Sequence, residues 1–229
     1  MRAGRLSRRA GLAAACVFGA LALWLGAPRV LRELDFFRLR RIELVGVRHL
    51  APDAVIGALR LGPDASVFAD RALLADRVRG VGGVVEARVE RRLPRALMIV
   101  VREVEPVALV PGPRGLLVVD GRGRTLPFDP ARSGLDLPIA RNADSGVAAV
   151  LAMIWSVDPA LFRDVLSARP TDRGDVVLEL ESRRVLFRRD AGPEDIRAVA
   201  LVAQDLAARE RPYAELDARY AGQVVVRRR

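Results

Sequence analysis

The sequence predicts an α+β fold, with one apolar N-terminal segment followed by two modules. Three observations lead to this prediction. Residues 10–27 carry no charge; strand and helix patterns follow one another in the order β-α-α-β-β over residues 36–105; and mostly antiparallel strands with inserted helices are expected over residues 106–229. A chain of 229 residues has room for two small domains and an anchor, which excludes a large multi-domain enzyme.

The apolar segment, AGLAAACVFGALALWLGA, ends at Pro28 and Arg29. As a helix it would extend about 27 Å against a hydrocarbon core of about 30 Å, and flanking arginines can reach the interface. We therefore expect a single transmembrane helix over residues 10–27, a cytoplasmic tail over residues 1–9 and a linker over residues 28–35. A buried core helix, or a signal peptide cleaved near Ala22, is the alternative. Because the tail is too short to be a domain, we expect the bulk of the chain outside the cytoplasm.

Composition excludes several classes of function. The net charge is +10 and every basic residue is an arginine, but the charge gathers at the two termini, so a basic face for nucleic acid is not expected. Cys16 is the only cysteine and His49 the only histidine. A zinc site or a nucleophile–histidine pair needs more such residues, so we expect no metal site and no catalytic residues, and we assign His49 to a turn or the surface. No cofactor and no small-molecule substrate is expected.

The first module opens with a strand over residues 39–45. A helix should begin at Pro52, because proline is tolerated in the first turn, and a second helix should run from Asp70 to the glycine-rich breaker at Gly80.

Two strands complete this module. Val85, Ala87 and Val89 alternate with charged residues, which is typical of a half-buried strand that Pro94 ends. The core face of the next strand is expected to consist of Leu97, Ile99 and Val101.

The second module is predicted from turn signals and apolar periodicity. The strands are expected at 107–110, 116–119, 125–128, 176–181, 216–220 and 223–227, and the helices at 147–157 and from Pro193 onward. The polar segment 129–146 is expected to be a loop.

Two groups of residues are candidates for a chemical site. Asp120-Gly121-Arg122-Gly123 could hold an anion, but it lacks phosphate-loop spacing, so a tight turn is expected. Asp129, Asp136 and Asp144 lie in the predicted loop, and a pair of carboxylates suffices for glycoside cleavage. A membrane-anchored cell-wall hydrolase is therefore an alternative function.

The last strand has no later strand to cover it, which makes it a candidate docking edge. Alternation puts Leu216, Ala218 and Tyr220 on one face of the preceding strand, with Asp217 and Arg219 on the other. Plain core and solvent faces explain this pattern as well as a docking surface does. The candidate partner-binding residues are Arg219, Tyr220, Gln223, Val224, Val225 and Val226.

Several motifs occur in an order that resembles one known family. They are Ala87-Arg88-Val89, Leu93-Pro94, Leu97 to Val101, Glu103-Val104-Glu105-Pro106-Val107-Ala108 and Asp217-Ala218-Arg219-Tyr220. This order is similar to the FtsQ family of bacterial cell-division proteins, called DivIB in some bacteria. The resemblance covers essentially the whole chain, and the short tail is the one departure from it.

The resemblance implies a POTRA domain over residues 36–105 and an FtsQ-type β domain over residues 106–229. It also implies a non-enzymatic, single-pass inner-membrane scaffold at the division septum, which helps control septal peptidoglycan synthesis. The implied partners are FtsB, received along the last strand, and FtsL, which acts with FtsB. A POTRA-bearing transport or secretion factor is a further alternative.

Overall fold

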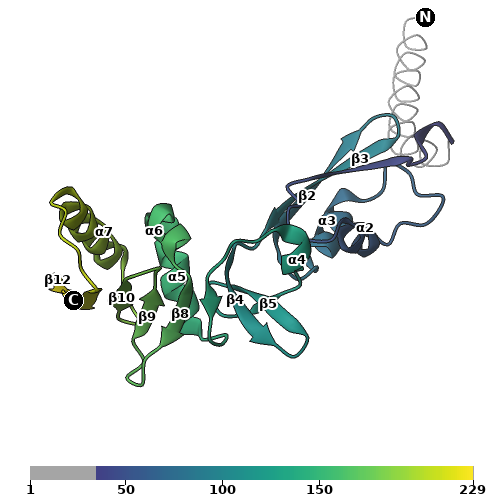
Figure 1. Ribbon diagram of the computed structural model, residues 1–229. Helices are drawn as coiled ribbons and strands as arrows, with labels where there is room; N and C mark the ends of the chain where they lie inside the picture. The colour runs from purple at the N-terminus through teal and green to yellow at the C-terminus, as the bar shows by residue number, and fades with distance from the viewer. Residues whose placement is uncertain (1–34, 229) are drawn as a thin grey trace, which may run out of the picture. The chain divides into compact units, whose positions relative to one another are not determined.

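The computed structural model describes residues 35–228, and these form two compact units (Figure 1). Within the described residues, the first unit contains Asp35–Val47 and Ala51–Arg102, and the second contains Arg48–Leu50 and Glu103–Arg228. The predicted transmembrane helix at residues 10–27 lies outside the described residues. None of the helices within residues 35–228 is long and apolar enough to cross a membrane.

The first unit has the predicted order of strand, helix, helix, strand and strand. After a short 3-10 turn, η1 (Asp35–Phe37), its elements are β1 (Arg41–Val45), α2 (Pro52–Leu59), α3 (Arg71–Arg79), β2 (Val84–Arg92) and β3 (Ala96–Glu103). The strands form a sheet in the order β1-β3-β2, in which β1 runs parallel to β3.

The core of this unit lies where alternation predicted it. Leu97, Ile99 and Val101 are buried on β3, and Ala87 and Val89 are buried on β2. The helix α3 begins as expected, because the side chain of its N-cap residue, Asp70, accepts hydrogen bonds from the backbone N–H groups of Ala72 and Leu73.

The exposure of Val85 on β2 differs from the prediction, and the backbone at Gly46 shows a constraint that was not predicted from the sequence. Val85 is 45% exposed, so the buried face of β2 begins two residues later than predicted. Gly46 ends β1 with a φ of +82°, and a Cβ there would lie 2.1 Å from the carbonyl oxygen of Val101. Only glycine fits this position, because it tolerates both the positive φ and the close approach of β3.

The second unit is a sheet with helices along one side (Figure 1). Its elements are β4 (Pro106–Gly112), β5 (Gly115–Asp120), β6 (Thr125–Leu126), α4 (Pro130–Ser133), β7 (Ile139–Ala140), α5 (Ser145–Val157), α6 (Pro159–Asp164), β8 (Ser167–Pro170), β9 (Val176–Glu179), β10 (Arg184–Phe187), α7 (Pro193–Ala208), β11 (Glu215–Tyr220) and β12 (Gln223–Arg227). The strand order is β12-β11-β10-β9-β8-β7-β4-β5-β6.

The sheet is mixed, although most of its pairs are antiparallel. The pairs β4–β7, β7–β8 and β10–β11 are parallel. The prediction of a loop over residues 129–146 was wrong in part, because this segment contains α4 and β7. A strand of two residues is too short to leave an alternating pattern, and β8 and β10, of four residues each, were also missed.

The core of the second unit lies between the sheet and its longest helices, α5 and α7. Leu151 and Ile154 of α5 and Ile196 of α7 are fully buried, as are Phe187 and Leu216 on the strands below. Burial of apolar surface, which stabilises the fold by about 25 cal/mol per Å² removed from water, is the main contribution that holds these layers together.

The strand β9 is buried on both faces, because Val176, Val177 and Leu178 are all buried. Val177 lies on the outer face, where its cross-strand neighbours are Arg169 and Leu186. These larger side chains leave Val177 only 4% exposed, which an alternating pattern cannot anticipate.

Glu103 begins the second unit and binds a turn of the same unit. Its carboxylate accepts hydrogen bonds from three backbone N–H groups. The N···O distances are 3.0 Å for Arg48, 2.9 Å for His49 and 3.0 Å for Leu50. His49 therefore lies in a turn, as predicted.

Replacing Glu103 with glutamine should lower the free energy of unfolding by about 1–3 kcal/mol, because its amide group has only one acceptor oxygen for three donors. Urea unfolding of the full chain measures this, with Glu105→Gln as a matched control at an exposed position of the same motif. Equal losses for both variants would contradict the assigned role.

Candidate partner-binding edge

The strand β12 lies at one end of the nine-stranded sheet. It pairs with β11 on one side, and no strand among residues 35–228 pairs with its other side. The chain reaches β12 through a turn in which Gly222 has a φ of +69°, a conformation that favours glycine. The backbone N–H and C=O groups on the outer side of β12 are therefore available to another strand.

The side chains of β12 alternate between two environments. Val224 and Val226 are half-buried and pack against the core, whereas Gln223, Val225 and Arg227 are exposed. This packing fixes one side of the strand while leaving the other open.

Tyr220 lies directly beside this edge. It is paired with Gln223 across the strands and is 52% exposed, and the register of the pair shifts between Asp217 and Tyr220. The aromatic ring is thus accessible next to the outer strand, at the end of β11 where the pairing is irregular.

Beneath the edge lies a network of buried charges that the sequence did not predict. Asp217, which alternation placed on a solvent face, is 0% exposed, and Glu215 is 3% exposed. The assignment of Asp217 to a solvent face was wrong, because Arg219 of the same strand and Arg227 of β12 cover this face.

The network joins three strands. Arg227 of β12 lies 3.2 Å from Glu215 and 3.6 Å from Asp217, which ties the outer strand to β11. Arg184 of β10 forms an ion pair with the other oxygen of Glu215. Arg219 donates to Asp217 at 2.7 Å and to Asp175 at 3.1 Å.

The hydrogen bonds between Asp217 and Arg219 shift the pKa of each group so that its charged form is favoured. Hydrogen bonds from Arg219 hold the pKa of the Asp217 carboxyl below its ordinary value, although burial opposes this effect. The same hydrogen bonds, together with those to Asp175, raise the pKa of Arg219. Asp217 is thus a bound carboxylate that holds β11 and β12 in place.

The six candidate partner-binding residues lie in three different environments. Tyr220, Gln223 and Val225 lie exposed along the edge. Arg219 is engaged with carboxylates of its own unit, while Val224 and Val226 face the core.

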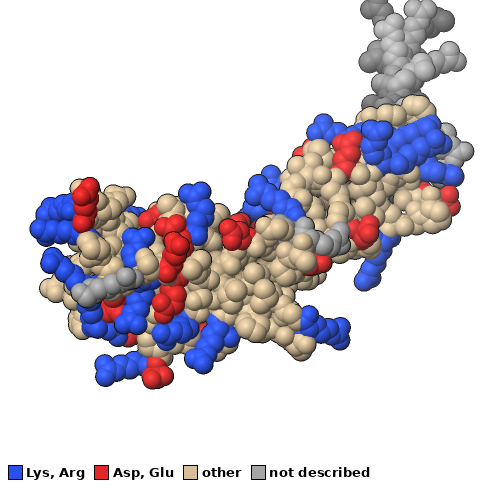
Figure 2. Space-filling model, viewed as in Figure 1, with Lys and Arg blue, Asp and Glu red and all other residues tan. Residues whose placement is uncertain are grey.

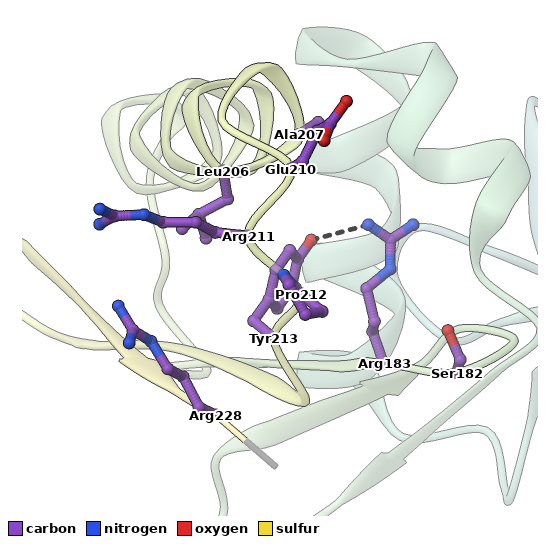
Figure 3. Close-up of a pocket in the computed structure, with 9 residues that line it drawn as sticks. All are labelled: Ser182, Arg183, Leu206, Ala207, Glu210, Arg211, Pro212, Tyr213 and Arg228. Carbon is purple, nitrogen blue, oxygen red and sulfur yellow. Dashed lines mark hydrogen bonds between the residues drawn. The ribbon is translucent and has the colours of Figure 1, made fainter.

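A groove of about 910 Å³ lies between the C-terminal end of α7 and the last strand (Figure 3). Arg183 donates to the hydroxyl of Tyr213 at 3.0 Å, and its guanidinium lies 5.2 Å from that ring. Figure 3 shows Arg211 and Arg228 across the groove from Arg183. No sequence signal indicated this groove, because parallel pairing of β10 with β11 brings together residues that are far apart in the chain.

Several of the carboxylates named above as candidates for an anion-binding or catalytic site have structural roles in the described chain. Asp120 accepts backbone N–H groups of Arg122 and Arg124 in the predicted tight turn. Asp129 and Asp144 cap the helices α4 and α5. No cluster of three or more potential metal ligands occurs among the residues that the structure describes.

No protein-family model matches the chain. A solved structure, the major extracytoplasmic domain of DivIB from Geobacillus stearothermophilus, gives a TM-score of 0.33 at 14% identity, covering 46% of this chain and 96% of that one.

Curated relatives match in sequence, and each is named cell division protein FtsQ. The chain is 29% identical to the protein of Caulobacter vibrioides over 65% of this chain and 47% of that protein. The protein of Anaeromyxobacter sp. (strain K) is 32% identical, and the match covers 60% of this chain and 48% of that protein. The protein of Mycobacteroides abscessus is 26% identical, and the match covers 70% of this chain and 53% of that protein. The chain thus spans about half the length of these relatives. The matches confirm the resemblance of the motifs: the chain is a homologue of the bacterial cell-division proteins named FtsQ.

Proposed function

We propose that the chain acts in cell division as a non-catalytic, membrane-anchored scaffold that recruits other division proteins by adding a strand of a partner to β12. The open outer side of β12, with Tyr220 beside it, carries this proposal. The relatives named FtsQ support the role in division.

Strand addition suits the chemistry of this edge. A partner strand would satisfy the open backbone groups of β12, and each hydrogen bond contributes about 1 kcal/mol net. The exposed side chains of Tyr220, Gln223 and Val225 would select the register of the incoming strand. The buried network holds β12 in position, so little ordering is needed when the partner binds.

The proposed partner is a segment of FtsB, acting together with FtsL. The proposed arrangement has a cytoplasmic N-terminus, one inner-membrane helix over residues 10–27, a POTRA domain over residues 36–105 and a β domain over residues 106–229. Through these partners the chain would help control septal peptidoglycan synthesis without catalysing a reaction.

Isolation of the full chain from membranes tests this function. We expect FtsB and FtsL to be recovered with it in amounts comparable to the chain itself. Recovery of a transport complex without these proteins would contradict the proposal, and so would cleavage of peptidoglycan by the purified chain.

A further inference from the structure

One end of the first unit combines exposed apolar side chains with arginines. We call it the interfacial patch; its members are Phe36, Arg40, Arg41, Arg92, Leu93 and Arg95. They come from the chain just before β1, from the start of β1 and from the turn between β2 and β3. Figure 2 shows basic side chains gathered over this end of the unit.

The pairing of β1 with β3 brings these segments together. The backbone N–H of Arg40 donates to the carbonyl of Arg95 at 2.9 Å, so the first strand begins beside the β2–β3 turn. The side chain of Arg95 donates to the carbonyl of Phe36 at 2.9 Å, and its guanidinium lies 5.4 Å from the ring of Phe36. These contacts join the segment before β1 to the β2–β3 turn that contains Leu93.

The apolar members of the patch are unusually accessible. Leu93 is 63% exposed and Phe36 is 56% exposed. Leu93 is flanked by Arg91 and Arg92 on one side and by Pro94 and Arg95 on the other. Exposed apolar side chains can enter the boundary between headgroups and acyl chains, while neighbouring arginines are attracted to anionic lipids.

The acidic residues near the patch do not neutralise it. Arg41 lies 3.8 Å from Glu43, and Arg92 lies 3.8 Å from Glu90. Both pairs are long and solvent-exposed, so they contribute little and leave the guanidinium groups able to contact another anion.

We propose that the interfacial patch binds the anionic surface of a phospholipid bilayer, with Phe36 and Leu93 at the headgroup level and the arginines on lipid phosphates. This rests on the proposed membrane anchor. The predicted helix ends at Ala27, and the nine residues from there to Phe36 can extend at most about 30 Å. Such a tether keeps the patch close to the bilayer and raises its effective concentration at the lipid surface.

The test uses the full chain reconstituted in vesicles, with a fluorescent label at the tip of the patch. The label is an environment-sensitive dye on Leu93→Cys, in a chain whose only natural cysteine is removed by Cys16→Ser. The matched control carries the dye on Val85→Cys. Val85 is also exposed and lies eight residues away near the other end of β2, roughly 26 Å along the strand.

Two vesicle compositions separate lipid charge from simple proximity: phosphatidylcholine alone, and phosphatidylcholine mixed with phosphatidylglycerol. In the anionic vesicles, we expect the dye at position 93 to shift its emission to the blue and to be quenched by spin-labelled lipid. The dye at position 85 should remain in water in both compositions. Arg41→Gln and Arg92→Gln should each lower the ratio of bound to free patch roughly fivefold.

Two outcomes overturn the proposal: a dye at position 93 that stays in water in both compositions, and a signal of equal size in both. Flotation with neutral vesicles measures anchoring separately. A chain that floats only with anionic vesicles would contradict the anchor yet support the patch, and one that floats with neither would contradict both.

Discussion

Replacing Asp217 with alanine is expected to lower the free energy of unfolding of the second unit by about 3–5 kcal/mol. The carboxylate is fully buried, binds Arg219 and lies 3.6 Å from Arg227. Its removal leaves Arg219 with only Asp175 as a partner and loosens the tie between β11 and β12. Denaturant unfolding of the full chain measures the effect.

The control for this variant is Asp172→Ala, which removes an exposed carboxylate of the same unit. It should change the stability by less than about 0.5 kcal/mol. A loss for Asp217→Ala no greater than that of the control would show that the buried network does not hold the edge.

The same network predicts the direction of a pH effect. The pKa of Asp217 is lower in the folded chain than its ordinary value of 3.8. Its contribution is therefore fully present above about pH 4 and is lost as the pH falls through the folded pKa. In Asp217→Asn, stability should fall less steeply below about pH 4 than in the parent chain.

Ile99→Asp is expected to abolish folding of the first unit. Ile99 is 0% exposed on β3, the middle strand of the sheet, and the buried residues in the described part of this unit are apolar apart from Ser66. An unpaired buried charge costs more than about 4 kcal/mol, which is comparable to the whole stability of a small domain.

Thermal unfolding followed by circular dichroism measures this loss. Ile99→Val is the control, since removing one methylene from the same site should cost only about 0.5–1.5 kcal/mol. Unchanged thermal stability of Ile99→Asp would mean that the strand face is wrongly assigned.

The first unit could be predicted almost completely because its signals are local. Pro52 and Asp70 mark helix starts, and Leu97, Ile99 and Val101 fill one face of a strand by simple alternation. Each of these effects acts within a few residues, so the sequence contains the information directly.

The second unit was predicted less completely because its sheet depends on distant segments. The two residues of β7 become a strand only because β4 and β8 lie on either side of them. Likewise, Asp217 is buried because Arg219 and Arg227 cover it, and Asp175, the second partner of Arg219, lies 44 residues away. Alternation assigns a face to a residue, but it does not show what covers that face.

The edge itself was accessible to sequence reasoning. Among the described residues no strand pairs with the outer side of β12, and this side was expected from the sequence to be open. The irregular pairing between Asp217 and Tyr220, beside this edge, was not indicated by any sequence pattern.

Binding of the FtsB–FtsL pair to the full chain and to Val225→Pro tests the proposed strand addition most directly. Proline removes one backbone donor of β12 and hinders an adjoining strand, while Val225 is exposed and lies on the outermost strand. We expect affinity to weaken at least about tenfold, or about 1.4 kcal/mol, with the thermal unfolding of the chain largely preserved. Tyr220→Ala, which leaves the backbone of β12 unchanged, should weaken binding as well and serves as the test if the proline variant unfolds. A folded Val225→Pro chain that binds the pair as tightly as the parent would contradict strand addition at β12.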